Sequence, residues 1–203
     1  MTMLAQQELM EPTPTRRIIV PTGRTGIWGV DPSSTRVAIA WIDTVTGARG
    51  VRIVPFAGLM GAARLAEIER VTQEFVDEIL ENGAPAPGLV LCEQPSGSNQ
   101  SVNLPLIMAV GVIQAAVYAA LARCLGSPVV VETITSSWWK KRACGRGDIY
   151  KPTKKKLGRP TVFMDYGVAV WARENGYDGL SWDEADAWGI AEAARRDVTL
   201  EQR

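Results

Sequence analysis

Residues 27–43 read IWGVDPSSTRVAIAWID, and this stretch decides the fold. Its two apolar halves are separated by Pro-Ser-Ser, which is typical of a turn, so the stretch predicts two antiparallel strands joined by a hairpin. A second turn signal, Thr46-Gly47, precedes another strand-like segment. The three consecutive strands expected from this region are 25–31, 36–43 and 50–56.

Downstream of the hairpins, helical and strand-like patterns alternate. Apolar residues at helical spacing between Leu65 and Ile79 predict a helix that ends near Asn82-Gly83. GLVLCEQ (88–94) and PVVVETI (128–134) are typical of buried strands. Between them lies the apolar segment 104–122, which is long enough to span a membrane but contains Pro105 and many small residues, and therefore favours a buried or interface helix.

The last third of the chain predicts helices, the final one opening at Ser181 with the Ser-x-x-Glu spacing of a capping box. The resulting order, βββαβαβαα, predicts an α/β fold in which helices flank a mixed central sheet. We expect a single domain over 18–203, preceded by a disordered tail, 1–17. The helices expected after the last strand include Trp138-Trp139, cover 161–174 and begin at Ser181.

Composition limits the chemistry that this chain can perform. The 203 residues include no histidine, which excludes a Ser-His-Asp triad, a His-ligated zinc and any imidazole base. The three cysteines lie far apart, which argues against a disulfide framework and fits a reducing cytoplasm. Nine basic residues and one acidic residue, Asp148, lie between Lys140 and Arg159. Such a block is either a solvated loop or a surface that contacts phosphates.

Four carboxylates lie at the ends of the expected elements. Asp31 ends the first strand, Glu93 ends the strand in GLVLCEQ, and Asp183 and Asp186 share one face of the last helix. Singly, Asp31 could be a turn residue and Asp183 a helix-start residue, but a partly buried Glu93 needs a partner. Carboxylates brought together need a cation, and oxygen ligands suit Mg²⁺, with Mn²⁺ as a substitute. Two such ions per site could clamp a phosphoryl group.

At this point the sequence resembles a family, the RuvC-type Holliday junction resolvases of the RNase H-like superfamily. The resemblance lies in IWGVDPSSTRVAIAWID (27–43), LVLCEQ (89–94) and DEADAWGIAEA (183–193), which are similar to the acidic motifs of that family. KKRACGRGDIYK (140–151) is similar to its lysine- and glycine-containing stretch. The resemblance extends from about Gly26 to Arg196 and implies an RNase H-like fold.

The resemblance implies a homodimer, without membrane attachment, that cuts branched DNA by a two-metal-ion mechanism. It implies that Asp31, Glu93, Asp183 and Asp186 are catalytic metal ligands and that Lys140 and Lys151 act at the scissile phosphate. Gly145 and Gly147 would let the backbone approach DNA. The expected DNA-binding residues are Lys140, Lys141, Arg142, Gly145, Arg146, Gly147, Lys151, Lys154, Lys155 and Lys156.

Three departures from the family pattern are those of a divergent member, such as a phage-encoded one. The segment after Glu93, QPSGS (94–98), lacks the aromatic residue expected there, which predicts modest discrimination among four-way junctions, forks and flaps. The interval after Lys151 is long, so a lysine among 154–156 could take its role, and the N-terminal extension is unusual. The alternatives are a non-catalytic DNA-binding relative, a transposase-like strand-transfer enzyme and an actin-like ATPase; the last would need two nucleotide-enclosing domains.

Overall fold

The computed structural model describes residues 16–58, 60–95, 104–145, 147, 167–177 and 181–203. Its centre is a five-stranded sheet in the order β4-β3-β2-β5-β6. Strand β3 runs antiparallel to both of its neighbours, β2 and β4, whereas β5 is parallel to β2 and β6 is parallel to β5. The strands are β2 (Gly26–Pro32), β3 (Arg36–Asp43), β4 (Arg49–Pro55), β5 (Pro87–Glu93) and β6 (Val130–Ile134).

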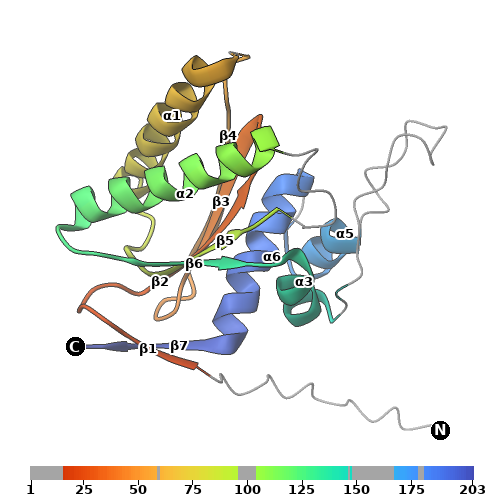
Figure 1. Cartoon of the computed structure of the whole chain (residues 1–203). Coiled ribbons are helices and arrows are strands. Elements are labelled where there is room, and N and C mark those ends of the chain that lie inside the picture. Colours follow the sequence, from red (N-terminus) through yellow and green to blue (C-terminus); the bar gives the residue numbers. More distant parts are fainter. Residues whose placement is uncertain (1–15, 59, 96–103, 146, 148–166, 178–180) are drawn as a thin grey trace, which may run out of the picture.

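Helices cover both faces of this sheet (Figure 1). Strand β2 shows how its pleat divides the core: Trp28 and Val30 pack beneath α1 and α2, whereas Ile27 packs on the opposite side, beneath α6. Because both faces are covered, the central strands are apolar throughout. The helices are α1 (Gly61–Glu81), α2 (Leu104–Leu125), α3 (Ser136–Cys144), α5 (Gly167–Glu174) and α6 (Trp182–Asp197).

The structure confirms the predicted fold class, a mixed central sheet flanked by helices, and the three N-terminal antiparallel strands. Helix α2 is long and apolar enough to cross a membrane by length and composition. In the structure it packs against α1 and buries seven residues in the core, so it is a core helix of this fold. The predicted helix 161–174 appears as α5, from Gly167, and residues 161–166 lie outside the described residues.

Two short strands were not predicted. Strands β1 (Arg16–Val20) and β7 (Val198–Gln202) pair in parallel and bring the two ends of the described chain together (Figure 1). Strand β1 begins at Arg16, whereas the rest of the expected tail, 1–15, lies outside the described residues. Each strand has only five residues and depends on a partner about 180 positions away, so no local pattern marks it.

Candidate active site

Two of the predicted acidic residues lie at the same edge of the sheet. Strands β2 and β5 are parallel, with Val30 beside Cys92, so the next residue of each strand, Asp31 and Glu93, emerges at the carboxyl edge. Both side chains are partly buried and line a cavity of about 160 Å³. This edge is where open parallel sheets commonly place their sites.

Helix α6 carries the other two acidic residues against β2, and Gly29 makes this close approach possible. A Cβ atom at Gly29 would lie 2.3 Å from the carbonyl oxygen of Ala187 and 2.5 Å from the amide nitrogen of Ala191. Only glycine therefore lets the helix backbone touch the strand. The contact brings the first turns of α6 to the sheet, where Asp186 is 3% exposed.

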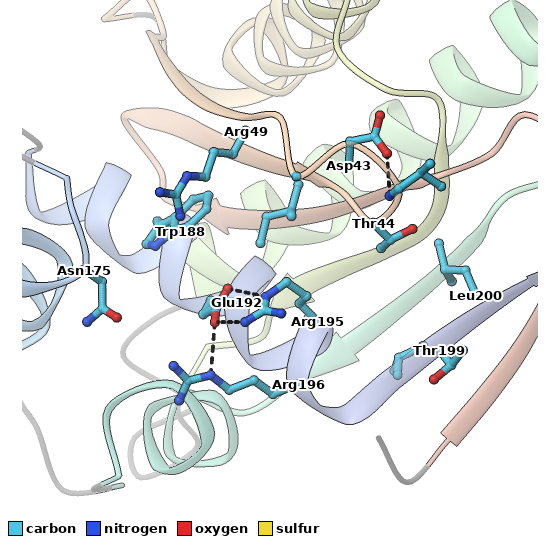
Figure 2. A pocket seen from close by; sticks show the side chains of 14 residues that line it. Asp43, Thr44, Arg49, Asn175, Trp188, Glu192, Arg195, Arg196, Thr199 and Leu200 are labelled. Atoms are coloured by element: carbon cyan, nitrogen blue, oxygen red, sulfur yellow. Dashed lines mark hydrogen bonds and ion pairs between the residues drawn. The ribbon is translucent and has the colours of Figure 1, made fainter. Parts of the chain in front are cut away.

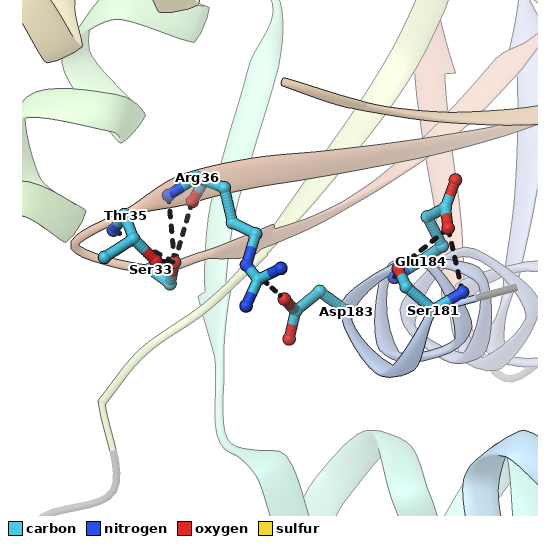
Figure 3. Close-up of polar contacts among 6 residues, drawn as sticks. All are labelled: Ser33, Thr35, Arg36, Ser181, Asp183 and Glu184. Atoms are coloured by element: carbon cyan, nitrogen blue, oxygen red, sulfur yellow. Dashed lines mark hydrogen bonds and ion pairs between the residues drawn. The ribbon is translucent and has the colours of Figure 1, made fainter. Parts of the chain in front are cut away.

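The start of α6 is fixed by the capping box that the sequence predicts. The Ser181 hydroxyl accepts a hydrogen bond from the Glu184 amide, and the Glu184 carboxylate accepts one from the Ser181 amide (Figure 3). These bonds satisfy amide groups that a helix start leaves without partners. Asp183 lies in this first turn, so the position of its carboxylate is set by a well-defined helix end.

Asp183 forms an ion pair with Arg36, the first residue of β3. Arg36 Nε lies 2.7 Å from Asp183 Oδ2, and Figure 3 shows the two side chains meeting between the β2–β3 hairpin and the start of α6. The Ser33 hydroxyl accepts from the Arg36 amide at 3.1 Å and donates to the Arg36 carbonyl at 3.0 Å. The hairpin thus holds the backbone of Arg36 in place.

The carboxylate of Glu93 lies in an environment that shifts its pKa. Burial raises its pKa, and the negative charge of Asp186 raises it further. A hydrogen bond of 2.7 Å from the indole Nε1 of Trp139 to Oε2, together with the charge of Lys140, opposes part of this rise. A raised carboxyl pKa beside a second carboxylate is the electrostatic pattern of a site that a cation would stabilise.

Trp139 and Lys140 are presented by α3, which packs against α6. Trp139 is fully buried, and its ring occupies the space that a side chain at Gly189 would need, since a Cβ there would lie 2.4 Å from the ring. The Lys140 side chain is largely buried, and its ammonium lies 5.2 Å from the centre of the Trp139 ring. One buried helix contact therefore places both the hydrogen-bond donor and the cation near Glu93.

The four predicted metal ligands share one region of the fold, although they do not form a compact ligand cluster. Asp31 and Glu93 line one cavity, Glu93 and Asp186 interact electrostatically, and Asp183 is paired with Arg36. Among the described residues, no group of three or more His, Cys, Asp or Glu side chains is arranged to hold a metal ion. The donor set consists of carboxylate oxygens, which fits Mg²⁺ or Mn²⁺.

The structure describes only part of the expected DNA-binding surface. Lys141 is exposed, whereas Arg142 stacks on Trp138 at 4.1 Å and pairs with Asp197 at 3.2 Å. Gly145 ends α3 in the left-handed conformation, with a φ of 75°. A Cβ atom at Gly147 would lie 3.1 Å from the carbonyl oxygen of Ser137. The other predicted DNA-binding residues lie outside the described part of the chain: Arg146, Lys151, Lys154, Lys155 and Lys156.

Sequence reasoning missed two residues of this site, Arg36 and Trp139. Arg36 begins a strand and carries no local signal, because its partner lies 147 positions further along the chain. Trp139 did carry one: a tryptophan in a short polar helix between a strand and a basic block needs a partner for its N–H when it is buried. The identity of that partner, Glu93, depends on the packing of α3 on α6.

A larger cavity, of about 590 Å³, lies at the opposite end of α6 and includes residues of the β3–β4 turn and of β7 (Figure 2). Its two carboxylates already have partners. Glu192 is bound by Arg195 and Arg196, as Figure 2 shows, and Asp43 accepts from the amides of Val45 and Thr46. We place the candidate active site at the smaller cavity, because Asp31 and Glu93 line it together and Asp186 acts electrostatically on Glu93.

The fold is similar to that of RuvC. A structure of Thermus thermophilus RuvC aligns with a TM-score of 0.53 and 21% identity, covering 84% of this chain and 93% of that one. T. thermophilus RuvC in complex with Holliday junction substrate aligns with a TM-score of 0.54 and 17% identity, covering 85% and 94%. The yeast mitochondrial Holliday junction resolvase Ydc2 aligns with a TM-score of 0.47 and 13% identity, covering 88% and 80%.

Neither a protein-family model nor a curated protein sequence matches this chain. At these low identities the two RuvC structures establish the architecture alone. The mixed central sheet, the helices on both its faces and the near-complete coverage of both chains identify the fold as RNase H-like.

Proposed function

We propose that this protein is a structure-selective endonuclease that cleaves phosphodiester bonds in four-way junctions and other branched DNA. The observation that carries the proposal is the contact region of β5, α3 and α6. There, Glu93 is partly buried near Asp186, accepts a hydrogen bond from the Trp139 N–H and lies near Lys140. The RuvC-like fold supports the same activity, since T. thermophilus RuvC has been solved with a Holliday junction substrate.

In the proposed mechanism the carboxylates of Asp31, Glu93, Asp183 and Asp186 hold two divalent ions, Mg²⁺ or Mn²⁺. Ions held there would supply an activated water and would stabilise the charge that develops on the phosphodiester oxygens. Lys140 supplies a positive charge at the same place and attracts the scissile phosphate. Lys151, outside the described residues, keeps its proposed role at the phosphate.

The proposed DNA-binding surface is the basic block 140–159, which begins in the last turns of α3. Lysine and arginine contacts to phosphates provide affinity without sequence specificity and make binding salt-dependent. QPSGS (94–98), which follows Glu93 in the sequence, contains no aromatic residue that could stack between bases. We therefore propose only modest preference for four-way junctions over forks and flaps.

We also propose a homodimer in which α2 contributes to the interface. Four of the large apolar side chains that remain exposed belong to this helix. A two-fold dimer would present two sites to the pseudo-two-fold axis of a four-way junction. These exposed residues of α2 are Leu104, Ile107, Met108 and Tyr118.

Electrophoresis of cleavage products tests the proposed function. Synthetic four-way junction, fork, flap and linear duplex substrates of matched sequence are incubated with Mg²⁺, with Mn²⁺ or with excess chelator. We expect cleavage of the branched substrates that requires the divalent ion. Cleavage in excess chelator contradicts the metal mechanism. DNA binding without cleavage in either metal supports instead the non-catalytic relative.

A further inference from the structure

The ion pair between Arg36 and Asp183 joins a site carboxylate to a side chain that the proposed mechanism does not use. Arg36 Nε and Asp183 Oδ2 are 2.7 Å apart, and the Arg36 side chain is 49% exposed whereas that of Asp183 is 16% exposed. A cation of the protein is thus in contact with one of the residues proposed to bind a divalent ion. Arg36 and a divalent ion would therefore compete for the Asp183 carboxylate.

This ion pair is easily exchanged. A half-exposed arginine remains hydrated, so a single ion pair of this kind gains little from its Coulomb attraction. A divalent ion carries twice the charge and can bind several carboxylates at once, which outweighs one guanidinium. Asp183 itself does not have to move far, because the capping box fixes the helix turn on which it lies.

Arg36 is also well placed to reach substrate. Its backbone is held by Ser33 at the β2–β3 hairpin, and the loop is held from the other side by Arg64, which donates to the Ser34 carbonyl. The same hairpin carries Asp31, which lines the site cavity. A guanidinium that is released from Asp183 keeps its planar donors, and these match the geometry of phosphate oxygens.

We propose that Arg36 is an exchangeable cation of the active site. In the metal-free protein it neutralises Asp183, and once Asp183 binds a divalent ion, Arg36 turns to a non-bridging oxygen of the DNA phosphodiester. This inference rests on the proposed nuclease function. In the described part of the chain Asp183 is paired with Arg36, and the positive charge of Lys140 acts on Glu93.

The experiment separates the two roles of Arg36, because they have opposite signs. Arg36→Ala should bind Mn²⁺ roughly two- to five-fold more tightly in calorimetry without DNA, since a competing ion pair of ordinary strength is gone. The same variant should cleave a four-way junction at least about ten-fold more slowly at saturating Mn²⁺, since a phosphate contact is lost. If Arg36 had only a structural role, its removal would lower both the Mn²⁺ affinity and the cleavage rate.

Arg17→Ala is the matched control, because Arg17 also pairs with a carboxylate, Glu201, but lies in β1 at the other end of the fold. It should change neither Mn²⁺ binding nor cleavage. Arg36→Lys retains a positive charge without the planar donors. Its Mn²⁺ affinity should fall back toward that of wild type, whereas its cleavage rate should stay close to that of Arg36→Ala. Circular dichroism and melting temperature establish that each variant is folded.

Unchanged or weaker Mn²⁺ binding by a folded Arg36→Ala variant overturns the exchange, and unchanged cleavage overturns the phosphate contact. Either result, obtained beside a wild-type protein that binds Mn²⁺ and cuts junctions, leaves the proposed function intact. A wild-type protein that neither binds Mn²⁺ nor cuts any branched substrate overturns the proposed function itself.

Discussion

The indole N–H of Trp139 donates a 2.7 Å hydrogen bond to Oε2 of Glu93, at the point where α3, α6 and the end of β5 meet. The Trp139 ring is fixed by its contact with Gly189, so this bond holds the orientation of the buried carboxylate. The bond also favours the charged form of Glu93 against burial and the nearby charge of Asp186. Trp139 is therefore a positioning residue for the candidate site.

Trp139→Phe should weaken the site while leaving the fold intact. Phenylalanine keeps an aromatic ring near Gly189 but cannot donate to Glu93, whose buried carboxylate then lacks one partner. We expect the free energy of unfolding to fall by about 1–3 kcal/mol in urea titrations, together with slower junction cleavage. Trp138→Phe is the control, since Trp138 stacks with Arg142 and should affect cleavage little. Equal losses in both variants would contradict the role of Trp139.

Gly29→Ala should displace α6. The new Cβ would meet the backbone of Ala187 and Ala191 at 2.3 and 2.5 Å, and neither helix backbone atom can move without shifting the helix. We expect a loss of about 3 kcal/mol or more in urea unfolding, at or above the usual range for overpacking. Gly58→Ala, which meets nothing within 4 Å, is the matched control and should be nearly neutral. A neutral Gly29→Ala would show that the helix–strand contact is looser than described.

Glu192 should make stability depend on pH at acid values. Burial alone would raise its pKa, but Arg195 and Arg196 outweigh burial and hold the pKa below its ordinary value of 4.5. The stabilisation is therefore complete above the ordinary pKa and is lost as pH falls through the lowered one. At pH 7, Glu192→Gln should cost about 2 kcal/mol, and this difference from wild type should shrink below about pH 4.

The comparison for Glu192 is Glu74→Gln, because Glu74 forms an exposed ion pair with Arg70 on α1. An exposed pair of this kind contributes at most about 1 kcal/mol, so the substitution should have a small effect at every pH. Thermal unfolding between pH 3 and pH 7 measures both series. A Glu192→Gln difference that does not change with pH would contradict the assignment.

Substitutions of the proposed metal ligands should reduce cleavage without weakening DNA binding. Asp31→Asn, Glu93→Gln and Asp186→Asn each remove a charge proposed to hold a divalent ion and leave the basic surface unchanged. We expect cleavage to fall by at least about a hundred-fold, with junction affinity in gel-shift assays equal to or tighter than that of wild type. Glu201→Gln, which removes a carboxylate in β7, should retain cleavage. Full activity of Asp186→Asn would exclude Asp186 as a required ligand.

Much of the fold and part of the site follow from local sequence patterns. Asp31 and Glu93 end apolar strands, and the capping box locates the start of α6, so chain-local information is enough to predict these positions. The Arg36–Asp183 pair and the Trp139–Glu93 bond depend on packing between distant segments and could not be predicted in the same way. The β1–β7 pairing was missed for the same reason.

Met108→Glu should convert a dimer to a monomer if α2 forms the interface. Met108 is 46% exposed on a helix that buries seven other residues in the core. A glutamate there would therefore face the partner subunit and leave the core of the monomer unchanged. Met60→Glu introduces the same change at an 86% exposed methionine that precedes α1, and it should leave association unchanged. Sedimentation velocity at micromolar concentration, without DNA, measures both. A wild-type protein that sediments as a monomer there would contradict the dimer, and dissociation by both variants would show that the effect is not specific to α2.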